Sequence, residues 1–181
     1  QNVGLFSVGD SLGAAKIAGD LTETNARVIS SVEETSKYKF ITEKDLFDVE
    51  YWSLEQAKIK KAKKSLQGNV VVITGSFGAI GSATYKLFKS CGAEVVLLDY
   101  NLQKVKEMRP KVKELCLHCD VTNKVSVKKA FKIITETYGG IDILISNAGS
   151  AIGGSIGEVD DKILRQSFED NFFSHQNCAS E

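Results

Sequence analysis

Residues 70–81 read Val-Val-Val-Ile-Thr-Gly-Ser-Phe-Gly-Ala-Ile-Gly, and this stretch decides the fold. Its first four residues are apolar and β-branched without a break, which is typical of a strand covered on both faces of a parallel sheet. A cluster of small residues follows, and the apolar positions after it recur at helical spacing, which predicts a helix over Ala79–Cys91. A strand, a glycine-rich turn and a helix in this order form the beginning of a β-α-β unit.

The residues after this helix continue to alternate between strand and helix patterns. Further strands are predicted over Glu94–Leu98, Val112–Cys119 and Ile141–Ile145, and further helices over Leu102–Met108, from Thr122 or Asn123 onward, and from Asp160 toward the C-terminus. Short connections of this kind give right-handed crossovers between parallel strands. We therefore expect an α/β fold with a doubly wound parallel sheet in the spatial order 3-2-1-4.

The first 67 residues have a different character. Apolar residues from Ser11 to Ser30 recur at the spacing of a helix with one buried face, and Thr42 with Asp45 brackets a short helix start. Ser53 with Gln56 forms a capping box for another helix, which ends in Lys58, Lys60, Lys61, Lys63 and Lys64. Because no aromatic residues interleave with these lysines, a solvated linker helix is favoured over a nucleic-acid patch. We expect a helical region with a linker at 1–67 and a separate domain at 68–181.

Composition and charge exclude several classes of partner. Lys plus Arg and Asp plus Glu both number 23 among the 181 residues, so nothing favours nucleic acid or an anionic membrane as a partner. No apolar run is long enough to cross a bilayer, and no signal peptide is recognisable, although the chain begins with Gln1 rather than Met. The cysteines are irregularly spaced, which favours a reducing compartment, and we expect a cytoplasmic location.

Cys116 and Cys119 form a Cys-x-x-Cys motif that contains His118, so metal binding or redox chemistry has to be considered. Both cysteines lie in a predicted strand, where side chains three residues apart point to opposite faces of the sheet. Their thiols would not converge on one metal ion, and there is no second Cys pair to complete a site. We therefore expect buried core cysteines and no metal site in this chain.

The turn after the first strand has the composition of a phosphate-binding turn. Small residues permit a tight turn, a close approach of a pyrophosphate to the backbone, and close packing of the helix on the strand. The N-terminus of the helix supplies unpaired N–H groups and a partial positive charge. The residues expected to bind a dinucleotide at this turn are Gly75, Ser76, Phe77, Gly78, Ile80 and Gly81.

Residues 74–81 resemble the T-G-x-x-x-G-x-G motif of short-chain dehydrogenases, with Gly75 and Gly81 on the first and third glycines and Ala79 in place of the second. The resemblance implies the N-terminal half of a Rossmann-type fold with a nicotinamide cofactor. Asp99 resembles the acidic residue that binds the adenosine ribose, and because its carboxylate would repel the extra phosphate of NADP, NAD is expected. The resemblance assigns further cofactor contacts to Tyr100, Asp120, Val121, Asn147, Ala148 and Gly149.

The same resemblance implies a proton-transfer system. Members of the family use a Ser and a Tyr-x-x-x-Lys, in which the lysine lowers the pKa of the tyrosine. Asn171 matches the helix asparagine of this system, and we expect the Ser, Tyr and Lys to lie beyond Glu181, so that the chain alone is inactive. Residues 85–89 and 100–104 share the Tyr-x-x-x-Lys spacing, but their places beside the glycine turn and the adenosine end are unsuitable for catalysis.

The N-terminal region resembles the end of a class II aldolase domain, and residues 45–58 (DLFDVEYWSLEQAK) resemble the linker of the bifunctional rhamnulose-1-phosphate aldolase/alcohol dehydrogenase family. This resemblance implies a small alcohol or aldehyde substrate, such as a lactaldehyde, and we expect a homo-oligomer. Val3 stands where simple class II aldolases have a zinc-binding histidine, which supports the expectation of no metal site in this chain. The alternative is a non-catalytic, regulatory dinucleotide-binding module; a downstream Ser and Tyr-x-x-x-Lys would distinguish the enzyme from it.

Overall fold

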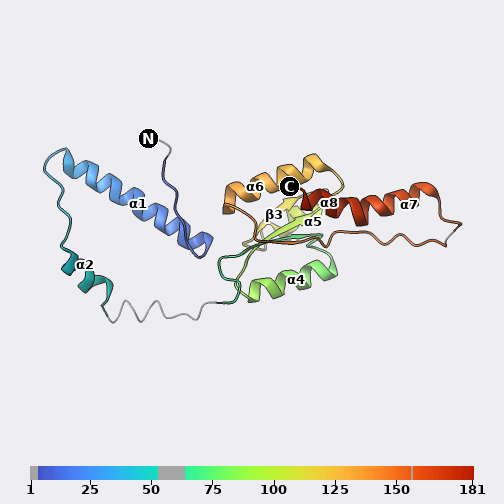
Figure 1. Ribbon diagram of the computed structural model, residues 1–181, viewed down its shortest axis with the longest axis horizontal. Helices are drawn as coiled ribbons and strands as arrows, with labels where there is room; N and C mark the ends of the chain where they lie inside the picture. Colours follow the sequence, from blue (N-terminus) through green and yellow to red (C-terminus); the bar gives the residue numbers. More distant parts are fainter. Residues whose placement is uncertain (1–3, 53–63, 156) are drawn as a thin grey trace. The chain divides into compact units, whose positions relative to one another are not determined.

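A computed structural model describes residues 4–52, 64–155 and 157–181 (Figure 1). Contacts between residues divide the chain into two units, Gln1–Ser65 and Leu66–Glu181. The predicted capping box at Ser53 and Gln56, and the lysine-rich helix except for its last lysine, lie outside the described residues.

The described part of the first unit contains the helices α1 (Leu12–Glu33) and α2 (Glu43–Glu50). Ser11 caps α1 and Thr42 caps α2, each through a side-chain oxygen that accepts a backbone N–H, and the second cap confirms the predicted helix start. The burial predicted for one face of α1 is wrong for the described residues. No residue of α1 is buried, and Ile17 is 61% exposed.

A four-stranded parallel sheet forms the centre of the second unit (Figure 1). The strands β1 (Val70–Thr74), β2 (Glu94–Asp99), β3 (Leu115–His118) and β4 (Ile143–Ile145) lie in the order β3-β2-β1-β4, which confirms the prediction. In the register of the sheet, Val72 of β1 lies opposite Val96 of β2 and Leu144 of β4. All five residues of β1 are buried, as the continuous β-branched run predicts.

Helices cover both faces of the sheet, and side chains of β1 alternate between the two cores that result (Figure 1). Val71 and Ile73 pack in the core on the side of α4 (Ala79–Ser90) and α5 (Leu102–Met108). Val70 and Val72 pack in the core on the side of α6 (Lys124–Tyr138) and α8 (Ser174–Ala179). This arrangement, with α4 and α5 on one face and α6 on the other, is the one that right-handed crossovers produce.

The third and fourth strands are shorter than predicted. Residue 112 was expected in the third strand, but the N–H of Val112 donates to the carbonyl of Met108 at 3.2 Å and so continues the turn that ends α5. Asp142 lies just before the first residue of β4 and forms two hydrogen bonds with Val70 of β1. Its N–H donates to the carbonyl of Val70, and its carboxylate accepts the N–H of the same residue at 2.7 Å.

The last predicted helix is divided into three segments. It begins at the predicted residue, because the side chain of Asp160 caps α7 (Asp161–Phe168). A short π-helix, η1 (Glu169–Phe173), interrupts it before α8 begins. A π-helical turn inside an α-helix frequently marks a functional site, and the sequence pattern did not predict this one.

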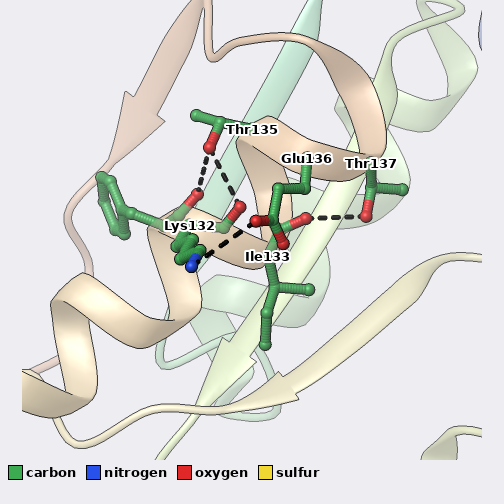
Figure 2. A network of polar contacts seen from close by, with 6 residues as sticks. Lys132, Ile133, Thr135, Glu136 and Thr137 are labelled. Carbon is green, nitrogen blue, oxygen red and sulfur yellow. Dashed lines mark hydrogen bonds and ion pairs between the residues drawn. The ribbon is translucent and has the colours of Figure 1, made fainter.

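Side chain–backbone hydrogen bonds hold the last turns of α6 (Figure 2). The hydroxyls of Thr135 and Thr137 donate to backbone carbonyls one turn earlier, at 3.1 and 2.7 Å. Lys132 and Glu136 form an exposed ion pair at 3.7 Å on the same turns. Gly139 then takes a left-handed conformation, with φ of 86°, and ends the helix so that the chain turns back toward β4.

The two cysteines of the Cys-x-x-Cys motif face opposite sides of the sheet, as predicted. Cys116 packs in the core beside α4 and α5, and Cys119 packs in the core beside α6. Within the described residues, no group of three or more His, Cys, Asp or Glu side chains is placed to hold a metal ion. None of the described helices has the length and apolar character that crossing a bilayer requires.

The core beside α6 gives the first testable prediction. Ile134 on α6 is fully buried, so Ile134→Ala leaves a cavity and is expected to lower the free energy of unfolding by about 2–5 kcal/mol. Val125→Ala on the same helix is the matched control, because Val125 is 78% exposed, and a change of less than about 0.5 kcal/mol is expected. Urea denaturation followed by far-UV circular dichroism measures both, and equal effects would contradict the placement of α6.

The cysteines give a second prediction. Burial raises the pKa of the Cys119 and Cys178 thiols to about 11, and the thiolate is the form that reacts. At pH 8 about one in a thousand of these thiols is ionised, so both are expected to resist a thiol reagent in the native protein and to react in urea. Peptide mass spectrometry measures the labelling, with half-buried Cys91 as the internal control. Rapid native labelling of Cys119 would show that it is not buried.

Candidate functional site

The turn between β1 and α4 lies at the carboxyl end of the sheet, where ligands bind in open α/β folds. Two of its glycines are sterically required. Gly75 has a φ of 61°, and a Cβ atom there would lie 3.0 Å from Cα of Ala148. A Cβ atom at Gly81 would lie 2.3 Å from the carbonyl oxygen of Gly75, which is closer than the two atoms can approach. The first turn of α4 therefore packs directly on the turn that precedes it.

The N-terminus of α4 is open to a ligand. Gly78 is its N-cap residue and provides no side-chain hydrogen bond, so the first N–H groups of the helix have no side-chain cap. Ala79, which replaces the second glycine of the motif, is exposed, and the side chain of Ile80 is 73% exposed. Free N–H groups and the positive end of the helix dipole together favour an anion such as a pyrophosphate.

Asn147 and Thr74 join the ends of β4 and β1 beside the turn. The hydroxyl oxygen of Thr74 accepts the N–H groups of Asn147 at 2.9 Å and of Ala148 at 3.0 Å. The side-chain amide of Asn147 donates in turn to the carbonyls of Thr74 and Gly75, at 2.9 and 3.2 Å. Asn147 therefore fixes the position of the turn and does not itself line the adjoining cavity.

On the other side of the turn, Ser76 and Phe77 are bound to the end of β2. The N–H and the hydroxyl of Ser76 both donate to the carbonyl of Leu98, each at 3.1 Å. The N–H of Phe77 donates to one carboxylate oxygen of Asp99 at 3.0 Å, and the N–H of Asn101 donates to the other at 3.0 Å. These two hydrogen bonds direct the carboxylate of Asp99 toward the turn, and Asp99 is only 6% exposed.

A cavity of about 380 Å³ lies beside this turn. Six of the predicted cofactor-binding residues line it: Gly75, Tyr100, Asp120, Val121, Ala148 and Gly149. The other predicted residues do not line it and instead shape the turn and the N-terminus of α4: Ser76, Phe77, Gly78, Ile80, Gly81, Asp99 and Asn147. The structure adds five lining residues that the sequence analysis did not assign to the cofactor site: Cys119, Thr122, Ser150, Gln166 and Asp170.

Asp170 is the most polar of the added residues and has two partners at the cavity. Its carboxylate accepts the hydroxyl of Ser150 at 2.6 Å and the side-chain amide of Gln166 at 2.7 Å. Two features of the sequence could have pointed to these residues. Ser150 directly follows the Asn-Ala-Gly motif, and Gln166 lies four residues, about one helical turn, before Asp170. The contact between loop and helix that brings them together has no local sequence signal.

Asn171 in η1 makes that contact. Its side-chain oxygen accepts the N–H of Ser150 at 3.0 Å, and its side-chain nitrogen donates to the carbonyl of the same residue at 2.8 Å. A Cβ atom at Gly149 would lie 2.6 Å from this oxygen, so the glycine is needed for the close approach. The described contacts therefore give Asn171 a positioning role, because it holds the loop after β4 against the π-helix.

The Tyr-x-x-x-Lys spacing at residues 85–89 forms a structural contact instead of a catalytic pair. Lys89 forms an ion pair with Glu114 at 2.6 Å, and the side chain of Glu114 is 5% exposed. Burial, together with a hydrogen bond to Glu114, raises the pKa of Tyr85 to about 12. Burial alone would raise the pKa of Glu114, but the hydrogen bonds from Lys89 and Tyr85 outweigh it and lower the pKa. Lys89 thus neutralises Glu114 and does not lower the pKa of the tyrosine.

Comparison with known families matches the two units separately. The short chain dehydrogenase family matches residues 69–181, and the second domain of the class II aldolases matches residues 1–59. The first of these matches contains the glycine turn, the cavity and the whole sheet.

Two curated relatives illustrate the likeness. The uncharacterized oxidoreductase YuxG of Bacillus subtilis is 29% identical over 158 residues, which is 82% of this chain and 23% of that protein. The meso-2,3-butanediol dehydrogenase of Serratia marcescens is 39% identical over 90 residues, which is 48% of this chain and 36% of that protein. The chain therefore spans between about a quarter and about a third of the length of these relatives.

Solved structures show the same fold. A short chain dehydrogenase from Mycobacterium smegmatis aligns with a TM-score of 0.58 at 25% identity, covering 62% of this chain and 50% of that one. A Brucella melitensis protein described as a short-chain dehydrogenase/reductase, glucose/ribitol dehydrogenase, aligns with a TM-score of 0.61 at 23% identity, covering 66% and 52%; this likeness shows the fold alone. With the family match over residues 69–181, the parallel sheet and the glycine turn, the chain belongs to the short-chain dehydrogenase family of oxidoreductases.

Proposed function

We propose that the unit Leu66–Glu181 binds NAD and is the cofactor-binding part of a short-chain alcohol dehydrogenase. The family implies a nicotinamide dinucleotide, and the charge of the cavity supports NAD in particular. Asp120 and Asp170 line the cavity, whereas no lysine or arginine is among the described residues that line it. The 2′-phosphate of NADP would add negative charge beside carboxylates with no cation to balance it, and NAD has a hydroxyl in its place.

The residues present fit the adenosine and pyrophosphate parts of a dinucleotide. The uncapped N–H groups at the start of α4 would bind the pyrophosphate, and Asp99 would accept the ribose hydroxyls. Asp120 and Val121 would contact the adenine, and Asn147–Gly149 would support the part of the cofactor above β1 and β4. The bound cofactor accepts or supplies a hydride, and the residues of this chain bind and orient it.

The role of Asn171 in proton transfer, the substrate and the assembly are part of the same proposal. A small alcohol or aldehyde such as a lactaldehyde is the proposed substrate, in a bifunctional enzyme that also carries an aldolase domain and forms homo-oligomers. The class II aldolase match over residues 1–59 supports the pairing of the two activities. The relative named as a meso-2,3-butanediol dehydrogenase supports a small alcohol.

Isothermal titration calorimetry of the full chain with NAD, NADP and ADP-ribose tests the cofactor. NAD is expected to bind at least about tenfold more tightly than NADP, which corresponds to about 1.4 kcal/mol of charge repulsion. ADP-ribose should behave like NAD if the adenosine end carries most of the recognition. Equal affinity for NAD and NADP would overturn the NAD preference, and binding of neither would overturn the cofactor-binding function itself.

The close contact at Gly81 gives a variant that tests the phosphate-binding turn. A Cβ atom there displaces Gly75 and with it the turn, so Gly81→Ala is expected to weaken NAD binding at least about tenfold. Gly140→Ala is the matched control, because a Cβ atom at Gly140 meets nothing within 4 Å. Calorimetry measures the affinities, and far-UV circular dichroism establishes that both variants are folded. Full NAD affinity in a folded Gly81→Ala variant would place the pyrophosphate elsewhere.

A further inference from the structure

The phosphate-binding turn is held from the β2 side by three hydrogen bonds. Two of them run from Ser76 to the carbonyl of Leu98, and the third runs from the N–H of Phe77 to the carboxylate of Asp99. Ser76 is 1% exposed and Asp99 is 6% exposed, so these bonds are shielded from water. A shielded hydrogen bond to a charged group is among the stronger ones in proteins, so the third bond is expected to dominate the anchoring.

The position of Phe77 gives this bond its importance. Phe77 directly precedes Gly78, the N-cap of α4, so the orientation of its peptide group sets where the first N–H groups of the helix point. These are the groups that would bind a pyrophosphate. The second oxygen of Asp99 accepts the N–H of Asn101, which is itself the N-cap of α5. One carboxylate therefore fixes the turn after β1 relative to the turn after β2.

We infer that Asp99 has two roles: it positions the phosphate-binding turn, and it accepts hydrogen bonds from the ribose hydroxyls of the cofactor. The inference rests on the proposed NAD-binding function and deepens it. Selectivity and affinity then depend on the same carboxylate. Removal of Asp99 loosens the turn for every dinucleotide, so the loss of NAD selectivity comes with a loss of affinity for both cofactors and not with a gain for NADP.

Amide hydrogen exchange on the unliganded full chain, followed by NMR, tests the anchor without any cofactor. Asp99→Ala is expected to accelerate exchange of the Phe77 amide at least about tenfold, because a charge-assisted hydrogen bond is lost. Asp99→Asn keeps one oxygen that can accept either N–H, so it should give an intermediate rate. Glu107→Ala is the control: it removes one exposed carboxylate from α5 and should leave the Phe77 amide unchanged.

Calorimetry on the same variants tests the coupling. Asp99→Ala should lower the affinity for both NAD and NADP at least about threefold, because the pyrophosphate site is disturbed. It should also reduce the ratio of the two affinities, because the ribose contact is lost. Ser76→Ala loosens the turn without removing the carboxylate, so it should weaken NAD and NADP by the same factor and keep their ratio.

The outcomes separate the inference from the function on which it rests. Unchanged exchange of the Phe77 amide in Asp99→Ala overturns the anchor, and so does an Asp99→Ala variant that binds NADP more tightly than the unmutated chain. Binding of neither cofactor by the unmutated chain overturns the proposed function. The exchange rates still decide the anchor in that case, because they are measured on the free protein.

Discussion

The contact between the first turn of α4 and the backbone of Gly75 is the constraint on which the candidate site depends. A Cβ atom at Gly81 would lie 2.3 Å from the Gly75 carbonyl oxygen, so helix and turn approach more closely than any side chain at this position would allow. This closeness keeps the N-terminus of α4 directly above the end of β1. Asn147 from the β4 side and Asp99 from the β2 side then prevent the turn from shifting. The position of this turn thus depends on β1 and its two neighbouring strands, β2 and β4.

Much of the fold could be predicted because local signals agreed with one another. The β-branched run at Val70–Ile73, the glycines after it, and Asn123 as a helix cap each indicate one local structure, and the strand order follows from right-handed crossovers. The amphipathic pattern of α1 was equally clear but predicted burial that the described residues do not show. Periodicity reports which face of a helix is apolar, and it carries no information about what covers that face.

The part of the site that could not be predicted depends on contacts between residues distant in sequence. The π-helix η1 and the cavity residues Gln166 and Asp170 take their positions from the pairing of Asn171 with Ser150, across 21 residues. The acidic residues at the strand ends show the opposite case. Asp99 and Asp120 both accept backbone N–H groups from the turn that follows, so each has a structural role at the same sequence position as its proposed binding role. A carboxylate at this place shapes the turn whether or not a ligand is bound.

The cluster of Tyr85, Lys89 and Glu114 has a consequence for the annotation of genomes. Residues four apart lie on the same side of any α-helix. A Tyr-x-x-x-Lys pattern therefore places the two side chains next to each other whether or not they take part in catalysis. In this chain a buried carboxylate engages both side chains and leaves the tyrosine a weaker acid than in water. A search that scores the spacing alone would count this helix as an active site. A search that also checks whether a carboxylate pairs with the lysine would distinguish a catalytic tyrosine from a tyrosine in a structural contact of this kind.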